Sequence, residues 1–282
     1  MKLRNFNLLI LSLLISTSSY PMMRALNTAA TGMAAQEQNV STISNNIANV
    51  NTIGFKKRRV EFQSLMYETV QEAGGRSSFD TRYNVGIQIG SGAKVAAIRK
   101  EFTSGTPQIT NNPFDLMISG DGFFGIILPN QQVMYTRDGS FNVDRNGVLV
   151  TKEGYTVAPS IQVPPNTISV TISDTGLAQA FIKNQMEPVN VGQIPVFTFT
   201  NPVGLKAHGK NLYRATMSSG TPVSNIPGQN KAGSVMQGAL ETSNVSIMNE
   251  MTNLIKAQRA YEMNSRVMKV ADEMLGTVNN LK

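Results

Sequence analysis

One segment of the chain has the spacing of a phosphate-binding loop. Residues 204–210 read GLKAHGK, which matches the glycine and lysine positions of that motif. The next position requires a Ser or Thr hydroxyl for magnesium, but Asn211 stands there. The residues that follow have the composition of a strand, whereas bound phosphate needs a helix N-terminus. The pattern therefore argues against a nucleotide site.

Other residues suited to catalysis or metal binding are few. The chain has no cysteine and one histidine, His208, so thiolate metal sites, iron–sulfur clusters and cysteine nucleophiles are excluded. Asp138, Asp144 and Asn146 cluster in TRDGSFNVDRNG, but the alternate spacing and closing glutamate of a calcium loop are absent. We expect turn residues there, and no catalytic residue, metal or cofactor. A carboxylate pair for glycoside chemistry stays open as an alternative, although no pair stands out.

The run KKRR at residues 56–59 is the one dense basic segment of a chain with net charge +7. Such a run is compatible with nucleic acid. Only Phe55 and Phe62 lie nearby, however, and single-strand binders interleave several aromatic residues with the charges. Cations after a helix C-terminus also complement its dipole. We therefore expect a structural or interface role and no nucleic-acid or small-molecule partner.

The composition indicates a folded protein with surfaces that contact other protein. Of the 282 residues, 41% are apolar and 15% are charged, below the ~25% charge of an average soluble chain. Residues 1–21 resemble a secretory leader, with a basic start and the apolar run LLILSLLI, but no A-x-A cleavage site follows. We expect an upstream extension with the working chain starting at Met22 or Met23; the alternative is a signal-like leader.

Two long segments at the chain ends have helical periodicity, and the part between them has the pattern of strands. Between residues 85 and 235, short β-branched runs such as TISVTI alternate with turn dipeptides such as Asp138-Gly139. The fold class expected is α+β, with terminal helices paired as a coiled-coil-like domain and an all-β domain inserted between them. The expected segments are 1–21 (extension), 22–60 (N-terminal helix), 61–95 (connector, mobile near residues 70–84), 96–235 (β-domain) and 236–282 (C-terminal helix).

The N-terminal helix is unusually poor in charge. Only Arg24 and Glu37 are charged between residues 22 and 55, whereas amides are frequent, as in NNIANVN at residues 45–51. An amide donates and accepts hydrogen bonds without the cost of desolvating an ion, so this helix suits contact with protein on several sides. The C-terminal helix carries more charge and should keep one face in water. Expected at subunit interfaces are Leu26, Met33, Val40, Ile43, Asn45, Asn46, Ile47, Asn49, Val50, Ile247, Met251, Leu254, Tyr261, Met263, Val267, Val270 and Met274.

Several long motifs resemble the bacterial flagellar rod and hook family. They include MMRALNTAATGM at residues 22–33, SNNIANVNTIGFKKRRVEFQ at 44–63, NPFDLMISGDGFF at 112–124 and AQRAYEMNSRVM at 257–268. Within the family, EFQSLMYETVQEAGG at 61–75 is most similar to distal rod subunits. Proximal rod and hook subunits share the terminal motifs and are the alternatives. The family motif residues are Thr52, Gly54, Phe55, Lys56, Gln258, Arg259, Ala260, Glu262 and Asn264.

The resemblance implies a structural protein rather than an enzyme; a secreted peptidoglycan-acting enzyme is the remote alternative. Family members polymerise helically into a hollow shaft that crosses the periplasm and transmits torque to the hook. The implied partners are other copies of the chain, the proximal rod, hook and ring proteins of the basal body, and the flagellar type III export apparatus, which exports the family without a cleaved signal. The implied location is the flagellar basal body, with the helices as an inner tube and the β-domain outside.

Overall fold

The computed structural model describes the backbone of residues 2–74, 83–183, 185 and 187–280, and the side chains of residues 22–277 within those ranges. Contacts divide the chain into two compact units. Unit 1 consists of residues 1–45, 59–99 and 248–282, and unit 2 consists of residues 46–58 and 100–247. Each unit thus combines segments that are far apart in the sequence.

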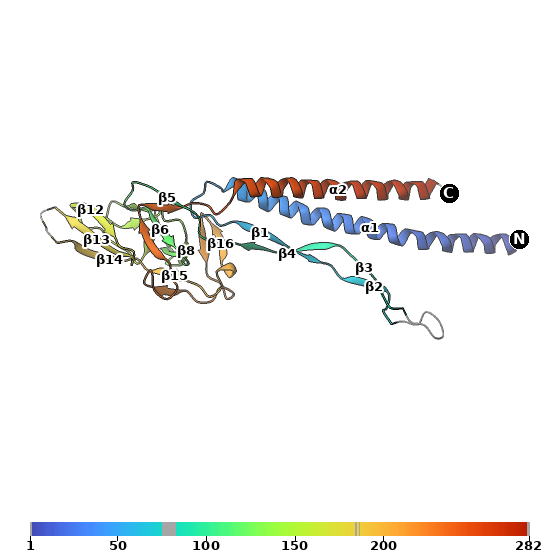
Figure 1. Cartoon of the computed structure of the whole chain (residues 1–282), viewed down its shortest axis with the longest axis horizontal. Coiled ribbons are helices and arrows are strands. Elements are labelled where there is room, and N and C mark those ends of the chain that lie inside the picture. Colours follow the sequence, from blue (N-terminus) through green and yellow to red (C-terminus); the bar gives the residue numbers. More distant parts are fainter. Residues whose placement is uncertain (1, 75–82, 184, 186, 281–282) are drawn as a thin grey trace. The chain divides into compact units, whose positions relative to one another are not determined.

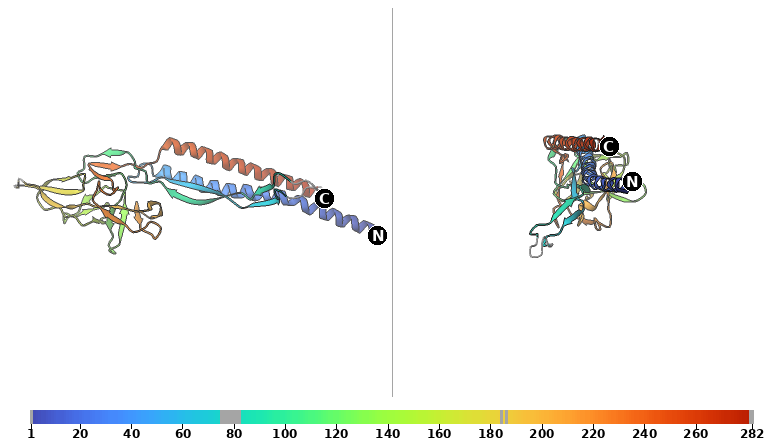
Figure 2. Two further views of the ribbon diagram at one scale, coloured as in Figure 1. Left: turned by 60° about the horizontal axis from the view of Figure 1, so that its bottom comes forward. Right: turned by 90° about the vertical axis from the view of Figure 1, so that its right-hand side faces the viewer.

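Unit 1 contains two long helices that run side by side in opposite directions (Figures 1 and 2). They are α1 (Lys2–Ala48) and α2 (Ile247–Asn280), which extends to within a few residues of the chain end. The helices approach closely at Gly32, where an added Cβ would lie 2.8 Å from the Asn264 amide nitrogen. Two long helices at the chain ends, with a mostly β middle between them, confirm the α+β class.

Helix α1 is shorter at its C-terminal end than the expected 22–60. It ends at Ala48, and a turn follows in which Gly54 has a φ of +68°, a left-handed conformation that glycine adopts without strain. Strand β1 then begins at Arg58. The backbone of α1 also continues through the expected leader as far back as Lys2. No described helix is long and apolar enough to cross a membrane, within the residues searched.

The expected connector at residues 61–95 consists largely of strands. The first two-stranded sheet pairs β1 with β4, and the second pairs β2 with β3. In the second, Tyr67 lies opposite Gly90 and Glu68 opposite Ile89, with a register shift between Thr69 and Gln71. The residues expected to be mobile lie partly outside the described ones. The strands are β1 (Arg58–Ser64), β2 (Tyr67–Gln71), β3 (Ile87–Gly90) and β4 (Ala93–Lys100).

Unit 2 is built on a seven-stranded sheet in the order β16-β17-β8-β7-β11-β10-β9. One three-stranded sheet (β12-β13-β14) and three two-stranded pairs (β15-β18, β19-β6 and β20-β5) complete it. The strands are β5 (Pro107–Ile109), β6 (Leu116–Ser119), β7 (Phe124–Ile127), β8 (Val133–Thr136), β9 (Asn142–Val143), β10 (Leu149–Val150), β11 (Thr156–Ala158), β12 (Thr167–Ile172), β13 (Leu177–Ile182), β14 (Val189–Gln193), β15 (Val196–Thr198), β16 (Lys206–Gly209), β17 (Leu212–Arg214), β18 (Val223–Asn225), β19 (Ser234–Gln237) and β20 (Ala239–Glu241); a 3-10 turn, η1, spans Pro202–Gly204.

Two apolar clusters hold unit 2 together. The larger contains Phe124, Ile126 and Val157, all without exposed surface, and the smaller is aromatic, with edge-to-face contacts of Phe123 and Tyr135. Strands continue beyond the expected end of the β-domain at residue 235, because β19 and β20 pair back onto the domain. Consequently, the C-terminal helix begins at Ile247 rather than at residue 236.

Candidate functional site

The N-terminal motif that follows α1 lies in unit 2 against the segment that precedes α2. The Gly54 N–H donates to the Glu241 carbonyl oxygen at 2.8 Å, and the Lys57 N–H donates to the Asn244 side-chain oxygen at 2.7 Å. The Asn244 amide nitrogen in turn donates to the carbonyl oxygen of Glu101 at 2.9 Å. Polar contacts within unit 2 therefore join the start and the end of the β-domain.

A fully buried ionic cluster lies at the centre of this junction. The Lys56 ammonium and the Glu241 carboxylate have no exposed side-chain surface and are 2.7 Å apart. Lys56 also donates to the Thr103 carbonyl oxygen at 2.7 Å, and the Gly105 N–H donates to Glu241 at 2.9 Å. The Arg137 guanidinium lies 3.5 Å from Glu241. One carboxylate therefore faces two cations.

Burial shifts the pKa values of both cations in this cluster. It lowers the pKa of Lys56, and nearby Arg137 lowers it further, while Glu241 opposes both effects. Burial likewise lowers the pKa of Arg137, whose guanidinium also donates to the carbonyl oxygens of Ile118 and Gly120. Every group in the cluster has a partner that belongs to the same chain. The arrangement is that of a structural junction rather than of an open reactive site.

The structure bears on two expectations for this region. The first lysine of the basic run at residues 56–59 is the buried member of the cluster, which agrees with the structural role expected for the run. Asn46, expected to face a neighbouring subunit, is only 1% exposed. Its amide donates to the Arg58 carbonyl oxygen at 2.8 Å and accepts from the Arg58 N–H at 3.0 Å. Asn46 thus satisfies the chain's own backbone after α1 ends.

The residues with possible chemistry occupy turns. Residues 204–210 form part of the β16–β17 hairpin, and no helix follows them. The Asp138 carboxylate accepts from the backbone N–H and the hydroxyl of Ser140, as expected of a turn residue. Within the described residues, no group of three or more His, Asp or Glu side chains is placed to hold a metal ion.

Helix α2 presents two different stripes. The inner stripe is made of small or polar side chains, with Ala257 and Ala271 buried and Asn264 half-buried. The outer stripe consists of Met263, Val267, Val270 and Met274, which are larger apolar side chains spaced three or four residues apart and remain exposed. Most of the α2 residues expected at subunit interfaces are exposed, and only Leu254 is half-buried; the exposed ones are Ile247, Met251, Tyr261, Met263, Val267, Val270 and Met274. They are thus accessible in the single chain.

The expected interface residues of α1 are more covered. Ile43 is buried within the chain, so its side chain is not available to a neighbour. Half-buried are Leu26, Met33, Val40, Ile47, Asn49 and Val50, whereas Asn45 is exposed. Among the family motif residues, Gly54, Phe55 and Lys56 are buried and Thr52 is half-buried. On α2, Gln258, Arg259 and Glu262 are exposed, and Ala260 and Asn264 are half-buried.

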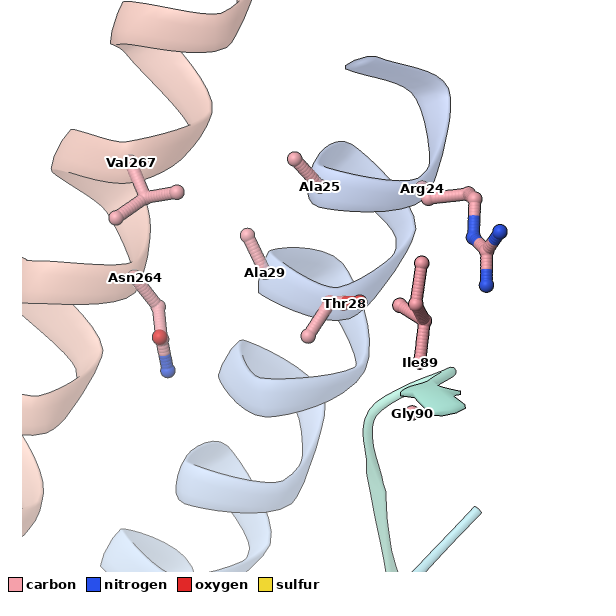
Figure 3. A pocket seen from close by; sticks show the side chains of 8 residues that line it. All are labelled: Arg24, Ala25, Thr28, Ala29, Ile89, Gly90, Asn264 and Val267. Atoms are coloured by element: carbon pink, nitrogen blue, oxygen red, sulfur yellow. The ribbon is translucent and has the colours of Figure 1, made fainter. Parts of the chain in front are cut away.

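A groove of about 610 Å³ lies in unit 1 between α1, α2 and β3. Figure 3 shows Asn264 and Val267 of α2 pointing toward α1, where Ala25 and Ala29 point back toward them. Arg24 turns away from α2, and its guanidinium lies 3.0 Å from the Glu68 carboxylate of β2. The groove is apolar at its floor and has one cation at its rim.

The β2–β3 hairpin exposes several large apolar side chains. Met66 is 86% exposed and Val85 77% exposed, although both are apolar. Also exposed are Tyr67, Val70, Tyr83, Ile87 and Ile89. An isolated two-stranded hairpin is marginal in water, and exposed apolar patches of this kind mark contact surfaces.

Sequence reasoning missed the hairpin surface and the buried cluster. The apolar residues of the hairpin were visible in the sequence, and so was the turn dipeptide Gly74-Gly75, but the segment was interpreted as a mobile connector rather than as paired strands. Lys56 and Glu241 are separated by 185 positions. No local pattern joins such residues, so only an alignment of related chains could have indicated the contact.

Three family models match the chain. They are the flagellar hook protein FlgE/F/G D1 domain at residues 117–180, the flagellar basal body rod FlgEFG protein C-terminal region at residues 236–281, and the flagella basal body rod protein at residues 26–56. The matches lie in the middle of the chain and at both of its ends, in the order in which the sequence motifs occur.

Full-length relatives agree with these matches. The flagellar basal-body rod protein FlgG of Borreliella burgdorferi is 49% identical over 93% of this chain and 99% of its own length. FlgG of Caulobacter vibrioides is 46% identical over 92% of this chain and all of its own length. The flagellar hook-basal body complex protein FlhP of Bacillus subtilis is 30% identical over 93% of this chain. A solved hook protein, FlgE2 of Helicobacter pylori, is 12% identical over 66% of this chain at a TM-score of 0.23, too low to bear on the fold. With near-complete coverage and identities close to one half, the chain belongs to the family of flagellar basal-body rod proteins of the FlgG type.

Proposed function

We propose that the chain is a structural subunit of the flagellar basal-body rod, and of its distal part. The observation that carries the proposal is the outer stripe of α2, whose large apolar side chains are exposed in the single chain. Identity near one half to basal-body rod proteins named FlgG, against 30% to FlhP, supports the distal assignment. A structural subunit fits a chain in which the buried charges of Lys56, Arg137 and Glu241 pair with one another.

The subunits polymerise helically into a hollow shaft that crosses the periplasm and transmits torque to the hook. A heterologous contact, in which one patch meets a different patch on the next copy, generates a helix when its rotation does not close. In this proposal α1 and α2 pair as a coiled-coil-like layer, and the charged face of α2 lines the channel. The remaining partners are the proximal rod, hook and ring proteins and the type III export apparatus.

Electron microscopy of basal bodies from a strain that lacks this protein tests the assignment. A rod truncated in the periplasm, without a hook, is the expected result. A complete rod that lacks only the hook would assign the chain to the hook, and a rod interrupted near the inner membrane would assign it to the proximal rod. Basal bodies of normal form would refute the proposal.

A further inference from the structure

The β16–β17 hairpin of unit 2 belongs to a long segment that contains no acidic residue. Between Glu187 and Glu241 the sequence has neither aspartate nor glutamate, and Glu241 itself is fully buried. Four lysines and arginines lie in the same segment. Three of them belong to the hairpin, namely Lys206, Lys210 and Arg214. The hairpin therefore concentrates positive charge where the neighbouring sequence supplies no counter-charge.

Two of these cations lie directly opposite each other. Lys206 of β16 pairs with Arg214 of β17 in the antiparallel register, which places both side chains on one face of the hairpin with their Cβ atoms ~5 Å apart. Both residues are exposed. Like charges in such a cross-strand pair destabilise a sheet. The pair therefore lowers the stability of the hairpin unless an anion lies between the two side chains.

Within the described part of the chain, no side chain supplies that anion. Neither Lys206 nor Arg214 forms an ion pair with a described acidic residue. Strand β8, which pairs with β17, contains no charged residue, and β16 is the edge strand of the sheet. Lys210 differs, because its ammonium lies 5.6 Å from the centre of the Tyr155 ring. The opposed pair is thus accessible to a ligand, whereas Lys210 has a contact of its own.

Contacts within unit 2 hold the backbone of both strands. Tyr213 precedes Arg214 and lies on the opposite face of the hairpin, where it is buried in the smaller, aromatic cluster. The Lys100 ammonium donates to the carbonyl oxygen of Leu205, directly before β16, at 2.7 Å. The strands that carry Lys206 and Arg214 are therefore fixed, so the two cations are positioned for one ligand before it binds.

We infer that Lys206 and Arg214 together bind a phosphate group. A guanidinium donates two parallel hydrogen bonds to phosphate oxygens, and an ammonium adds a compact charge with three donors. The bound anion would also remove the repulsion between the two cations. The inference concerns unit 2 alone and goes beyond the rod assignment, on which it does not depend. A free phosphate ion and the phosphate of a lipid headgroup share this chemistry, and the experiment distinguishes them.

Titration of the isotope-labelled chain with inorganic phosphate, at constant ionic strength, tests the site by nuclear magnetic resonance. The amide resonances of residues 206–214 should shift until the site is saturated. Lys206→Gln and Arg214→Gln should each raise the half-saturating phosphate concentration about fivefold, as expected for the loss of an exposed ion pair. The control Lys210→Gln removes the same charge from the same hairpin and should change that concentration less than about twofold, because its cation already contacts Tyr155.

Sedimentation with lipid vesicles distinguishes the two sources of phosphate. The vesicles contain phosphatidylcholine and phosphatidylglycerol in equal parts, and vesicles of phosphatidylcholine alone are the reference. Binding to the anionic vesicles that falls about fivefold in Lys206→Gln and is kept in Lys210→Gln would assign the ligand to a lipid headgroup. Saturable binding of inorganic phosphate without binding to vesicles would assign it to a soluble phosphate.

Urea unfolding gives a second measurement that needs no bound lipid. Without phosphate, Arg214→Gln should be at least as stable as the unsubstituted chain, because the change removes a like-charge repulsion. Phosphate should raise the unfolding midpoint of the unsubstituted chain more than that of the variant. A variant that is less stable without phosphate would show that Arg214 has a structural role and would overturn the inference. Equal phosphate titrations for all three glutamine variants, or no shift of residues 206–214, would also overturn it.

Discussion

Replacing Glu241 with glutamine should destabilise unit 2 more than replacing either of its cationic partners. Glutamine keeps an oxygen that accepts from Lys56 and from the Gly105 N–H, so the change removes charge but little volume. The two buried cations then lose the carboxylate that contacts both of them, and Asp121 remains as a nearby anion. Lys56→Met leaves one cation, Arg137, opposite one carboxylate, and the Thr103 carbonyl oxygen still accepts from Asn244.

The distances give the size of the effect. At an effective dielectric constant of ~20, charges 2.7 Å apart attract by about 6 kcal/mol and charges 3.5 Å apart by about 5 kcal/mol. Desolvation costs several kcal/mol for each ion and offsets most of this attraction. Removing one partner from a buried pair typically costs 3–5 kcal/mol, so we expect about 4 kcal/mol for Glu241→Gln and about 2 kcal/mol for Lys56→Met.

Urea unfolding followed by near-ultraviolet circular dichroism measures both changes in the purified chain. Tyr135 and Tyr213 are buried against phenylalanine rings in unit 2 and supply the signal. The double variant should cost clearly less than the sum of the single variants, because it removes one charge of each sign. A free energy of unfolding that falls less for Glu241→Gln than for Lys56→Met would refute the reasoning.

Three further changes test other features of unit 2 and its junction. Burial raises the pKa of the Tyr213 hydroxyl to about 12 from 10.0, so the stabilising contribution of this group is complete below pH 10 and is lost as the pH rises to 12. Relative to the Tyr213→Phe variant, the free energy of unfolding of the unsubstituted chain should fall by about 2.7 kcal/mol over that range. An equal pH dependence of both proteins would contradict this prediction. Gly54→Ala places a Cβ 2.7 Å from the backbone of Arg137 at a φ of +68°. It should lower the free energy of unfolding by well over the ~1–2 kcal/mol expected for the control Gly154→Ala, where φ is +81° but the space around the Cβ is open. Equal losses of stability for the two variants in denaturant unfolding would contradict the close approach. Asn46→Leu leaves the Arg58 N–H and carbonyl oxygen without their hydrogen-bond partner and should lower the free energy of unfolding by about 1–3 kcal/mol. The control Asn27→Leu, at an exposed position, should lower it by about 0.5 kcal/mol or less. Normal stability of Asn46→Leu together with failed assembly would instead place Asn46 at an interface.

The sequence predicted the secondary-structure elements better than the contacts between them. Helical periodicity located α1 and α2, and β-branched runs between turns located the β-domain, because both signals depend on residues close together in the chain. Periodicity draws attention to large side chains, so it selected Met263 and Val267 and passed over Ala257 and Ala271, which face the chain's own interior. It therefore found an apolar stripe but did not show that a second, inner stripe of small residues exists.

Polar residues were harder to place. The amides of NNIANVN were correctly recognised as unusual, but Asn46 turned out to hold the chain's own backbone because α1 ends two residues later. Lys56, Arg137 and Glu241 are ordinary charged residues in the sequence, and only folding brings them together. Contacts across so many positions leave no periodic signal, which is why the junction was not predicted.

The ion pair between Lys56 and Glu241 also bears on how a subunit folds. Its two members are separated by 185 positions, so nearly the whole middle of the chain must be present before they meet. A chain that ends short of Glu241 would lack the carboxylate that contacts both buried cations, so we expect unit 2 to be markedly less stable in it. On this reasoning, stable closure of unit 2 requires the segment that leads into α2.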